Sequence, residues 1–246
     1  MRIAADLHIH SALSPCGSLE MSPRAIVERA LELGLDMIAV TDHNSVENGL
    51  CAAGLGSRLG LAVICGMEAQ TREDVHLLCL FPGPGQAEAF HGEVYPLLPD
   101  VPNNPDYFGD QVVVDCDDEI LRFEPRLLLN GLDAGIEELV ALVRSFGGFA
   151  IPAHVESPQF GLLPSLGFVP PELEDCPLEI ACGSSCERAV SAYPSLAGRR
   201  LVKNSDAHYL VDIGRAYTVY DAVDGSLAAV YQAARSGRYR IAVREG

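Results

Sequence analysis

The stretch DMIAVTDH at residues 36–43 indicates the fold, because it is a continuous apolar run that ends in polar residues. Such a run is typical of a strand that is buried on both faces of a parallel sheet. The preceding stretch SPRAIVERALELG has the start and stop signals of a helix: Ser22 as N-cap, Pro23 at the first helical position and Gly34 past the end. A helix followed by a buried strand predicts the alternation of an α/β protein.

The same alternation continues on both sides of this unit. We expect further helices at 46–58, 136–147 and 226–237, and further strands at 3–6, 61–70, 75–81, 148–154, 178–182 and 200–208. So regular an alternation predicts a parallel α/β architecture, most simply a βα barrel, in one domain over residues 1–246.

Two long stretches interrupt the alternation. Residues 84–133 contain the proline-rich YPLLPDVPNNPDYFGD and the acidic VDCDDE, and we interpret them as an insertion or lid over the barrel. Residues 155–177 form a second long loop. Loops longer than ~12–15 residues are often functional, so both are candidate walls of a pocket.

The charge of the chain limits its partners. It has 34 acidic and 17 basic residues, a formal net charge of -17, and Lys203 is the only lysine. Duplex DNA is normally held by lysine and arginine contacts to its phosphates, so we expect no duplex DNA partner. The acidic balance instead favours a small ligand, or a single chain end, whose negative charge is neutralised by bound cations.

Targeting and cysteine signals point to the cytoplasm. No apolar run reaches the ~18 residues that span a bilayer, so we expect no membrane partner. The N-terminus lacks the order of a signal peptide, which predicts a cytoplasmic protein. The eight cysteines form no CxxC pair, and we expect reduced thiols and no structural zinc knuckle.

Nearly every expected strand carries metal-capable side chains in it or at its end; only 178–182 is interpreted as having none. These residues are His8, His10, Asp42, His43, Glu68, His76, His154, Asp206 and His208. Barrel enzymes build their sites where the carboxyl ends of the strands converge. Because residues two apart in a strand share a face, His8 and His10 direct two imidazoles to one point. Histidine with aspartate and glutamate suits zinc, manganese or iron.

Each of these signals has an ordinary structural interpretation as well. A strand can simply expose two histidines, TDHNS (41–45) is also a suitable helix cap, and His154 is also compatible with a hydrogen-bonded core histidine. The metal hypothesis rests on the coincidence of their placement.

The ordered motifs DLHIHS, AVTDHNS, GMEAQT with VHLLCLF, IPAH and NSDAH resemble the PHP (polymerase and histidinol phosphatase) superfamily. The resemblance covers roughly 1–83 and 134–220. Within the superfamily, the chain looks most similar to stand-alone phosphoesterases of the ribonuclease AM and nucleotide-phosphatase branch. The resemblance implies a distorted seven-stranded (βα)7 barrel that holds two to three divalent metal ions.

The resemblance also implies the ligands. His8, His10, Glu68 and Asp206 would surround one metal, and Glu68 would bridge to a second that His76 and His154 complete. His43 and His208 would hold a third, with help from the loop after DLHIHS. Related chains often place an acidic residue or histidine in that loop, whereas SPCGS offers Cys16. As a ligand, Cys16 would favour zinc or iron; as an ordinary turn residue it would not bind metal.

The implied function is a metal-dependent phosphoesterase that hydrolyses a small phosphorylated substrate, such as a nucleotide or a sugar phosphate. A hydroxide held between the metals would attack phosphorus, and His43 or His208, if not bound to a metal, would protonate the leaving oxygen. Arg72 either contacts a phosphate or faces solvent.

Three alternatives remain open. One is a 5'-3' exonuclease or phosphodiesterase that acts on short oligonucleotides or RNA ends. Another is an amidohydrolase, which ranks low because many of these bridge two metals with a carboxylated lysine and Lys203 lies outside the middle of the barrel. The last is a metal-binding protein without catalytic activity.

Overall fold

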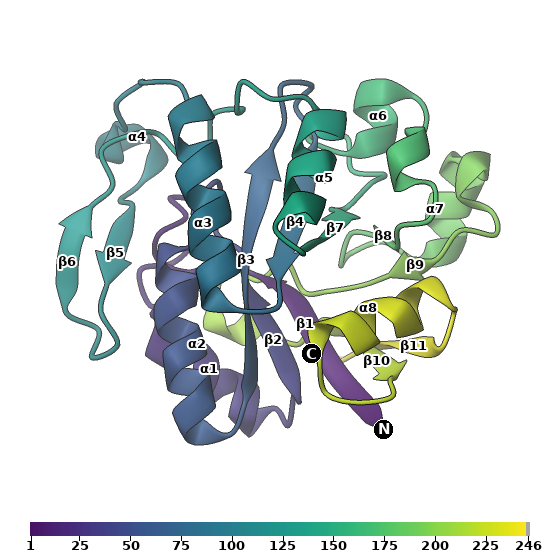
Figure 1. Cartoon of the computed structure of the whole chain (residues 1–246), viewed down its shortest axis with the longest axis horizontal. Helices are drawn as coiled ribbons and strands as arrows, with labels where there is room; N and C mark the ends of the chain where they lie inside the picture. The colour runs from purple at the N-terminus through teal and green to yellow at the C-terminus, as the bar shows by residue number, and fades with distance from the viewer. Residues whose placement is uncertain (245–246) are drawn as a thin grey trace.

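The computed structural model describes residues 1–244 as a mixed α/β fold around one curled sheet (Figure 1). The strands are β1 (Arg2–Ile9), β2 (Met37–Val40), β3 (Ala62–Gln70), β4 (His76–Phe81), β5 (Val112–Val114), β6 (Ile120–Phe123), β7 (Phe149–Pro152), β8 (Leu178–Glu179), β9 (Leu201–Val202), β10 (Ala216–Asp221) and β11 (Tyr239–Val243). The α-helices are α1 (Pro23–Glu32), α2 (Glu47–Leu59), α3 (Pro84–Val94), α4 (Pro105–Phe108), α5 (Ile136–Ser145), α6 (Leu162–Leu166), α7 (Cys186–Ala192) and α8 (Leu227–Arg235). Short 3-10 turns cover Tyr95–Leu97, Pro171–Leu173, Pro194–Leu196 and Leu210–Asp212.

The main sheet has seven strands in the order β11-β10-β1-β2-β3-β4-β7 and curls into a half-barrel. Strands β1, β2 and β3 run parallel, as the apolar runs predict. The expected strands at 178–182 and 200–208 pair with each other as a separate two-stranded sheet, β8–β9. Strands β10 and β11, which the alternation does not predict, extend the main sheet beyond β1.

The expectation of an all-parallel sheet is wrong at β4, which runs antiparallel to both β3 and β7. Only residues 71–75 connect β3 to β4, and Thr71 donates its N–H to the carbonyl of Val75 across this turn. So short a connection closes a hairpin, whereas a parallel pair needs a crossover of a dozen or more residues. Figure 1 shows the two arrows side by side in opposite directions.

Backbone hydrogen bonds tie the small β8–β9 sheet to both sides of the main sheet. Val155 just after β7 donates to Glu179 at 2.9 Å, and His10 just after β1 donates to Ala207 at 2.9 Å. The segments that follow β7, β8, β9 and β1 are therefore neighbours at one end of the fold.

Helices cover both faces of the sheet. Helix α1 begins as the sequence predicts: Ser22 accepts a hydrogen bond from the Ala25 N–H, and Pro23 occupies the first turn. Helices α1 and α2 pack against apolar side chains of β1 and β2, and α3 and α5 pack against β3 and β4. Helix α8 covers the opposite face, where it contacts side chains of β1, β4 and β7. Among residues 1–244, no helix is long and apolar enough to cross a bilayer.

The interrupted stretch 84–133 contains two different kinds of structure. Its first part is α3, whose Phe90 ring lies 4.8 Å from that of Phe81 in the core. Its later part is the β5–β6 hairpin, which Figure 1 shows at the edge of the molecule beside α3. The alternation of strand and helix thus continues through α3, and the chain leaves it only afterwards.

Candidate metal centre

The candidate residues meet at one end of the sheet. His8 and Glu68 lie near the carboxyl ends of β1 and β3, and His154 follows β7. His76 is the first residue of β4, but because β4 is antiparallel its start lies beside the end of β3, where His76 pairs with Gln70. The antiparallel strand therefore supplies a ligand to the same rim. We call this end of the sheet the rim.

The carboxylate of Glu68 occupies the middle of the rim and is buried. Five imidazoles surround it: Glu68 Oε1 lies 3.3 Å from His8 Nε2, 2.8 Å from His76 Nδ1 and 3.1 Å from His154 Nε2, and Oε2 lies 3.3 Å from His10 Nε2 and 3.1 Å from His43 Nδ1. Both oxygens of one carboxylate thus face separate groups of nitrogen atoms, an arrangement that suits a bridging ligand.

Asp206 and His208 complete the rim beside the two histidines of β1. Asp206 Oδ1 lies 3.3 Å from Nε2 of His8 and 3.3 Å from Nε2 of His10. His208 donates from Nδ1 to the carbonyl oxygen of Asp206 at 2.9 Å. The structure also brings Cys16 here: donor atoms of His10, Cys16, His43 and His208 all lie within 4.8 Å of one another. All nine residues that the sequence analysis names as ligands therefore lie in one cluster.

Backbone strain accompanies two of these residues and Asn44, which directly follows His43. Asn44, His154 and Asp206 have φ angles of 48°, 29° and 52°, in the left-handed region that L residues rarely adopt. Asn44 compensates with hydrogen bonds from its amide to the carbonyls of Leu128 and Asn130. Strain of this kind costs on the order of 1–3 kcal/mol at each position and clusters at functional sites.

A second layer of side chains orients the two histidines of β1. Nδ1 of His8 lies 3.0 Å from a carboxylate oxygen of Glu179, which also accepts hydrogen bonds from Asn204 and the backbone N–H of His154. Nδ1 of His10 lies 3.0 Å from Ser14 Oγ. With Nδ1 engaged in this way, Nε2 of each ring is directed toward the centre of the rim, as in metal-binding histidines.

Two members of this layer were not among the predicted ligands, although the sequence analysis named Asp42 as a metal-capable residue. Asp42 accepts hydrogen bonds from Ser11 and Ser14, and so holds the hydroxyl that contacts His10. Glu179 lies on the strand 178–182, which the sequence analysis interpreted as carrying no metal-capable side chain; that interpretation is wrong. A glutamate within the apolar run LEIAC was the signal, since buried carboxylates usually have partners.

The charges of the rim shift the pKa values of its side chains. Burial lowers the pKa of His8, but the carboxylates of Glu179, Asp206 and Glu68 outweigh it and raise the pKa well above its usual value. Burial also lowers the pKa of His10, but hydrogen bonds to Asp206 and Glu68 outweigh it and raise the pKa to about 9. Burial raises the pKa of Glu68, yet the surrounding imidazoles hold it well below its usual value. The part of the rim at His8 and His10 therefore favours positive charge, whereas burial lowers the pKa of His43 well below its usual value and that of His208 to about 4.

The donor set fits divalent cations. Among residues 1–244, the buried atoms His43 Nδ1, His154 Nδ1 and both ring nitrogens of His76 make no hydrogen bond, although Nδ1 of His43 and Nδ1 of His76 lie within 3.1 Å of Glu68 oxygens. Buried polar atoms without partners are rare in native proteins, and three such histidines around one carboxylate are readily explained as cation ligands. Imidazole, carboxylate and one thiol are the ligands that zinc, manganese and iron accept.

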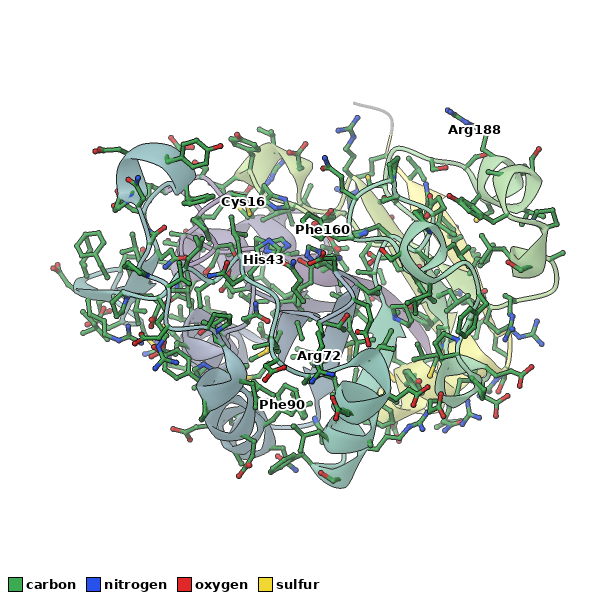
Figure 2. The ribbon with its side chains drawn as sticks, turned by 90° about the horizontal axis from the view of Figure 1, so that it is seen from above. Cys16, His43, Arg72, Phe90, Phe160 and Arg188 are labelled. Atoms are coloured by element: carbon green, nitrogen blue, oxygen red, sulfur yellow. The ribbon has the colours of Figure 1, made fainter. Side chains whose placement is uncertain are left out.

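A cavity of about 690 Å³ opens onto the rim and is lined by Cys16, His43, Glu68, His76, Asp206 and His208, among others. Phe160, from the loop after β7, forms part of its wall and stacks on His76 with ring centroids 4.4 Å apart. Figure 2 shows Cys16, His43 and Phe160 close together in the view from above, while Arg72 lies apart from them. Arg72 instead pairs with Asp133 and Glu138, so it takes the solvent-facing alternative.

Comparison with known proteins identifies the family. The model of the PHP domain family matches residues 6–159, and the PHP-associated model matches residues 197–239. The chain belongs to the PHP domain family. The two matched segments contain all nine candidate ligands, which agrees with the resemblance found in the sequence.

Sequence relatives match only part of this PHP chain and only part of their own length. An uncharacterised protein of Methanocaldococcus jannaschii is 36% identical in an alignment of length 78 that covers 28% of this chain and 45% of the relative. The PolC-type DNA polymerase III of Oceanobacillus iheyensis is 36% identical over 69 residues, which are 28% of this chain but 5% of the polymerase. The matches thus span less than half of either relative.

Solved structures share the fold over almost the whole chain. The lesion-specific endonuclease Q of Pyrococcus furiosus superposes with a TM-score of 0.67 at 19% identity, over 98% of this chain and 58% of the endonuclease. A two-domain protein of Bacteroides vulgatus, containing a predicted PHP-like metal-dependent phosphoesterase, has a TM-score of 0.62 at 18% identity, over 99% of this chain and 65% of that protein. At these identities the likeness establishes the fold.

Proposed function

We propose that this PHP protein is a hydrolase that cleaves phosphate esters with divalent cations bound at the rim. The observation that carries the proposal is the placement of five imidazoles within 3.3 Å of one buried carboxylate, Glu68, beside an open cavity. Phosphate esters suit such a site because bound cations supply Lewis-acid stabilisation of the phosphate charge and lower the pKa of a coordinated water. We also propose that the fold is a (βα)7 barrel in which β8 and β9 close the ring.

Three overlapping sets of residues would hold the cations. His8, His10, Glu68 and Asp206 form the first, and Glu68, His76 and His154 the second. Cys16, His43 and His208, with His10 close by, form the third. The bridging position of Glu68 supports two cations that share it. The thiol of Cys16 supports a softer cation in the third set, although burial and the charge of Glu68 raise its pKa to about 12, so cation binding must displace that proton.

The chain's own side chains would position these ligands and move a proton. Glu179 and Ser14 fix the rings of His8 and His10 through their Nδ1 atoms. Where the third set holds no cation, His43 and His208, which both line the cavity, are the candidates for protonating the leaving oxygen. The side chain of His208 is 26% exposed and that of His43 only 7%, which favours His208 for exchange of a proton with solvent.

Two classes of phosphate ester are candidates for the substrate. The net charge of -17 favours a small phosphorylated molecule, because bound cations would be the main source of attraction. The fold favours a nucleic acid equally, since endonuclease Q has been solved in complex with a 27-mer duplex carrying an abasic lesion at its active site. A different chemistry, that of an amidohydrolase with a carboxylated lysine, is disfavoured because Lys203 donates instead to the carbonyls of Cys182 and Ser184.

Two measurements on the purified full chain test the proposal. Elemental analysis should find two or three divalent cations per chain. The same sample should then be incubated with p-nitrophenyl phosphate, with mononucleotides, and with short oligonucleotides labelled at the 5' end, single-stranded and in duplex. Hydrolysis of the monoesters alone supports the small substrate, and trimming or cutting of the oligonucleotides supports the nuclease. A fully loaded protein that cleaves none of these phosphate esters contradicts the proposed function.

A further inference from the structure

A pair of cysteines takes no part in the rim. Cys51 is on helix α2, and Cys116 is in the turn between β5 and β6. Their Sγ atoms are 2.6 Å apart, much closer than two non-bonded sulfur atoms normally approach. Among the eight cysteines, all within the described residues, this is the only pair whose sulfur atoms are in contact.

Side-chain hydrogen bonds to the backbone of the hairpin and its turn hold the contact in place. Asn48, one turn before Cys51 on α2, donates to the carbonyl of Val112 at 3.0 Å and accepts from the N–H of Val114 at 3.1 Å. Arg24 on α1 donates to the carbonyl of Cys116 at 2.8 Å. Helix and hairpin are thus fixed relative to each other at the position of the two sulfurs, so they need little movement to bond.

We infer that Cys51 and Cys116 form a disulfide by exchange with a small-molecule disulfide, and that the bond fastens the β5–β6 hairpin to α2. The thiolate of one cysteine attacks a sulfur of the reagent RSSR, forming a mixed disulfide and releasing RS⁻. The second cysteine then attacks the protein sulfur of that mixed disulfide and releases the other RS⁻. In sum, the two protein thiols and RSSR yield one protein disulfide and two RSH.

The surroundings of the pair set the conditions of this exchange. Both residues are half-buried and accessible to a small reagent. Burial, the second thiol and the carboxylates of Asp118 and Asp115 raise the pKa of Cys51 well above its usual value. Because the thiolate is the attacking species, exchange should be slow at neutral pH and faster at alkaline pH. The same carboxylates should make the cationic reagent cystamine react faster than the anionic glutathione disulfide.

The inference changes one expectation from the sequence, which was that all eight thiols stay reduced. Composition and the missing CxxC motif carry no information on this pair, because 65 positions separate the two residues. A link that encloses so long a segment restricts the unfolded chain strongly. The oxidised protein should therefore unfold at a higher temperature than the reduced protein, by about 5–10 °C.

The experiment compares the full chain after equilibration with dithiothreitol or with cystamine at pH 8.5. After removal of the reagent, the protein is denatured with a chelator and alkylated. Mass spectrometry should find eight alkylated cysteines in the reduced sample and six in the oxidised one, with a linked peptide that joins Cys51 to Cys116. The thermal unfolding midpoint of the native oxidised sample should lie about 5–10 °C above that of the reduced sample.

Cys51→Ser and Cys116→Ser should each abolish the linked peptide and the thermal shift. Cys186→Ser, at another half-buried cysteine, is the matched control and should retain both. Eight alkylated cysteines after oxidation, a peptide that links other cysteines, or a link that lowers the unfolding midpoint would each overturn the inference. These readouts do not involve phosphate hydrolysis, so the inference stands or falls independently of the proposed function.

Discussion

The rim and the β5–β6 hairpin depart from ordinary burial in opposite directions. At the rim, Glu68 and His8 are polar and almost completely buried. On the hairpin, Ile120, Leu121 and Phe123 are apolar and 58%, 64% and 55% exposed. Buried charge is tolerated only where partners or cations compensate for lost hydration, whereas exposed apolar side chains contribute little to folding. The rim should therefore respond strongly to substitutions and to cations, and the hairpin weakly.

The largest expected effect is that of Glu68→Gln. A neutral amide cannot bridge two cations, so the variant should lose at least one bound cation and about 10³-fold or more of kcat/KM for phosphate ester hydrolysis. Elemental analysis and steady-state kinetics measure the two losses.

Glu47→Gln is the matched control, because Glu47 pairs with Arg122 of the hairpin instead of facing the rim. It should keep its cations and its activity. If Glu68→Gln kept both as well, the rim would not be the metal centre.

Removal of the cations should come next in size. Without them the imidazoles and carboxylates of the rim lose their compensation, and the unfolding midpoint should fall by about 5–10 °C. Hydrogen exchange sharpens the comparison: the backbone N–H groups of His10, Asn44 and Glu68, bonded within the rim, should exchange faster after chelation. Those of the hairpin pair Val113–Arg122 should be unchanged. Equal acceleration in both regions would contradict a local role for the cations.

Glu179→Gln tests the layer behind the rim. The amide keeps the size of the side chain but removes the charge that holds Nδ1 of His8 as a hydrogen-bond donor. Cation affinity should fall about 10–100-fold, and activity should recover when excess metal is added. Glu187→Gln, on the exposed surface of α7, is the control. Activity that excess metal cannot restore would assign Glu179 a different role.

Much of the rim could be predicted because its residues follow short strands whose apolar runs are visible in the sequence. The pairs His8 with His10 and Asp206 with His208 each lie two positions apart, so their meeting needed only the assumption of converging strand ends. His76 belongs to the rim for a reason that the alternation misses, since β4 is antiparallel and offers its first residue. The sequence analysis assigned His76 to the correct strand, but it expected that strand to run in the opposite direction.

The features of the fold and the site that were not predicted depend on tertiary contacts that no local pattern encodes. Strands β10 and β11 pair with β1 from the far end of the chain, and the sequence suggested strand periodicity for neither. Glu179 was overlooked because its partner His8 lies 171 positions away. The contact between Cys51 and Cys116 likewise depends on how the hairpin packs on α2, which the proline-rich stretch did not indicate.

A smaller effect is expected from pH. Cations bind neutral imidazole, but the metal-free rim holds a proton on His10, whose pKa is about 9, and on His8, whose pKa is raised as well. Binding below pH 9 must therefore release protons, and cation affinity should rise up to about tenfold per pH unit for each proton released. Titration calorimetry in buffers of different ionisation enthalpy counts these protons. Affinity that is constant between pH 6 and 8 would contradict the raised pKa values.

The smallest effect should come from the hairpin. Leu121 is 64% exposed, so Leu121→Ser removes little buried apolar surface and should change the free energy of unfolding by no more than about 0.5 kcal/mol. Cation content and kcat/KM should be unaltered, because the side chain lies on the outer hairpin and not among the residues that line the cavity. Chemical denaturation of the reduced protein measures the first quantity. A loss above about 1 kcal/mol would mean that Leu121 is covered in solution, and the contrast between the two regions would then reflect an unseen contact of the hairpin and not its exposure.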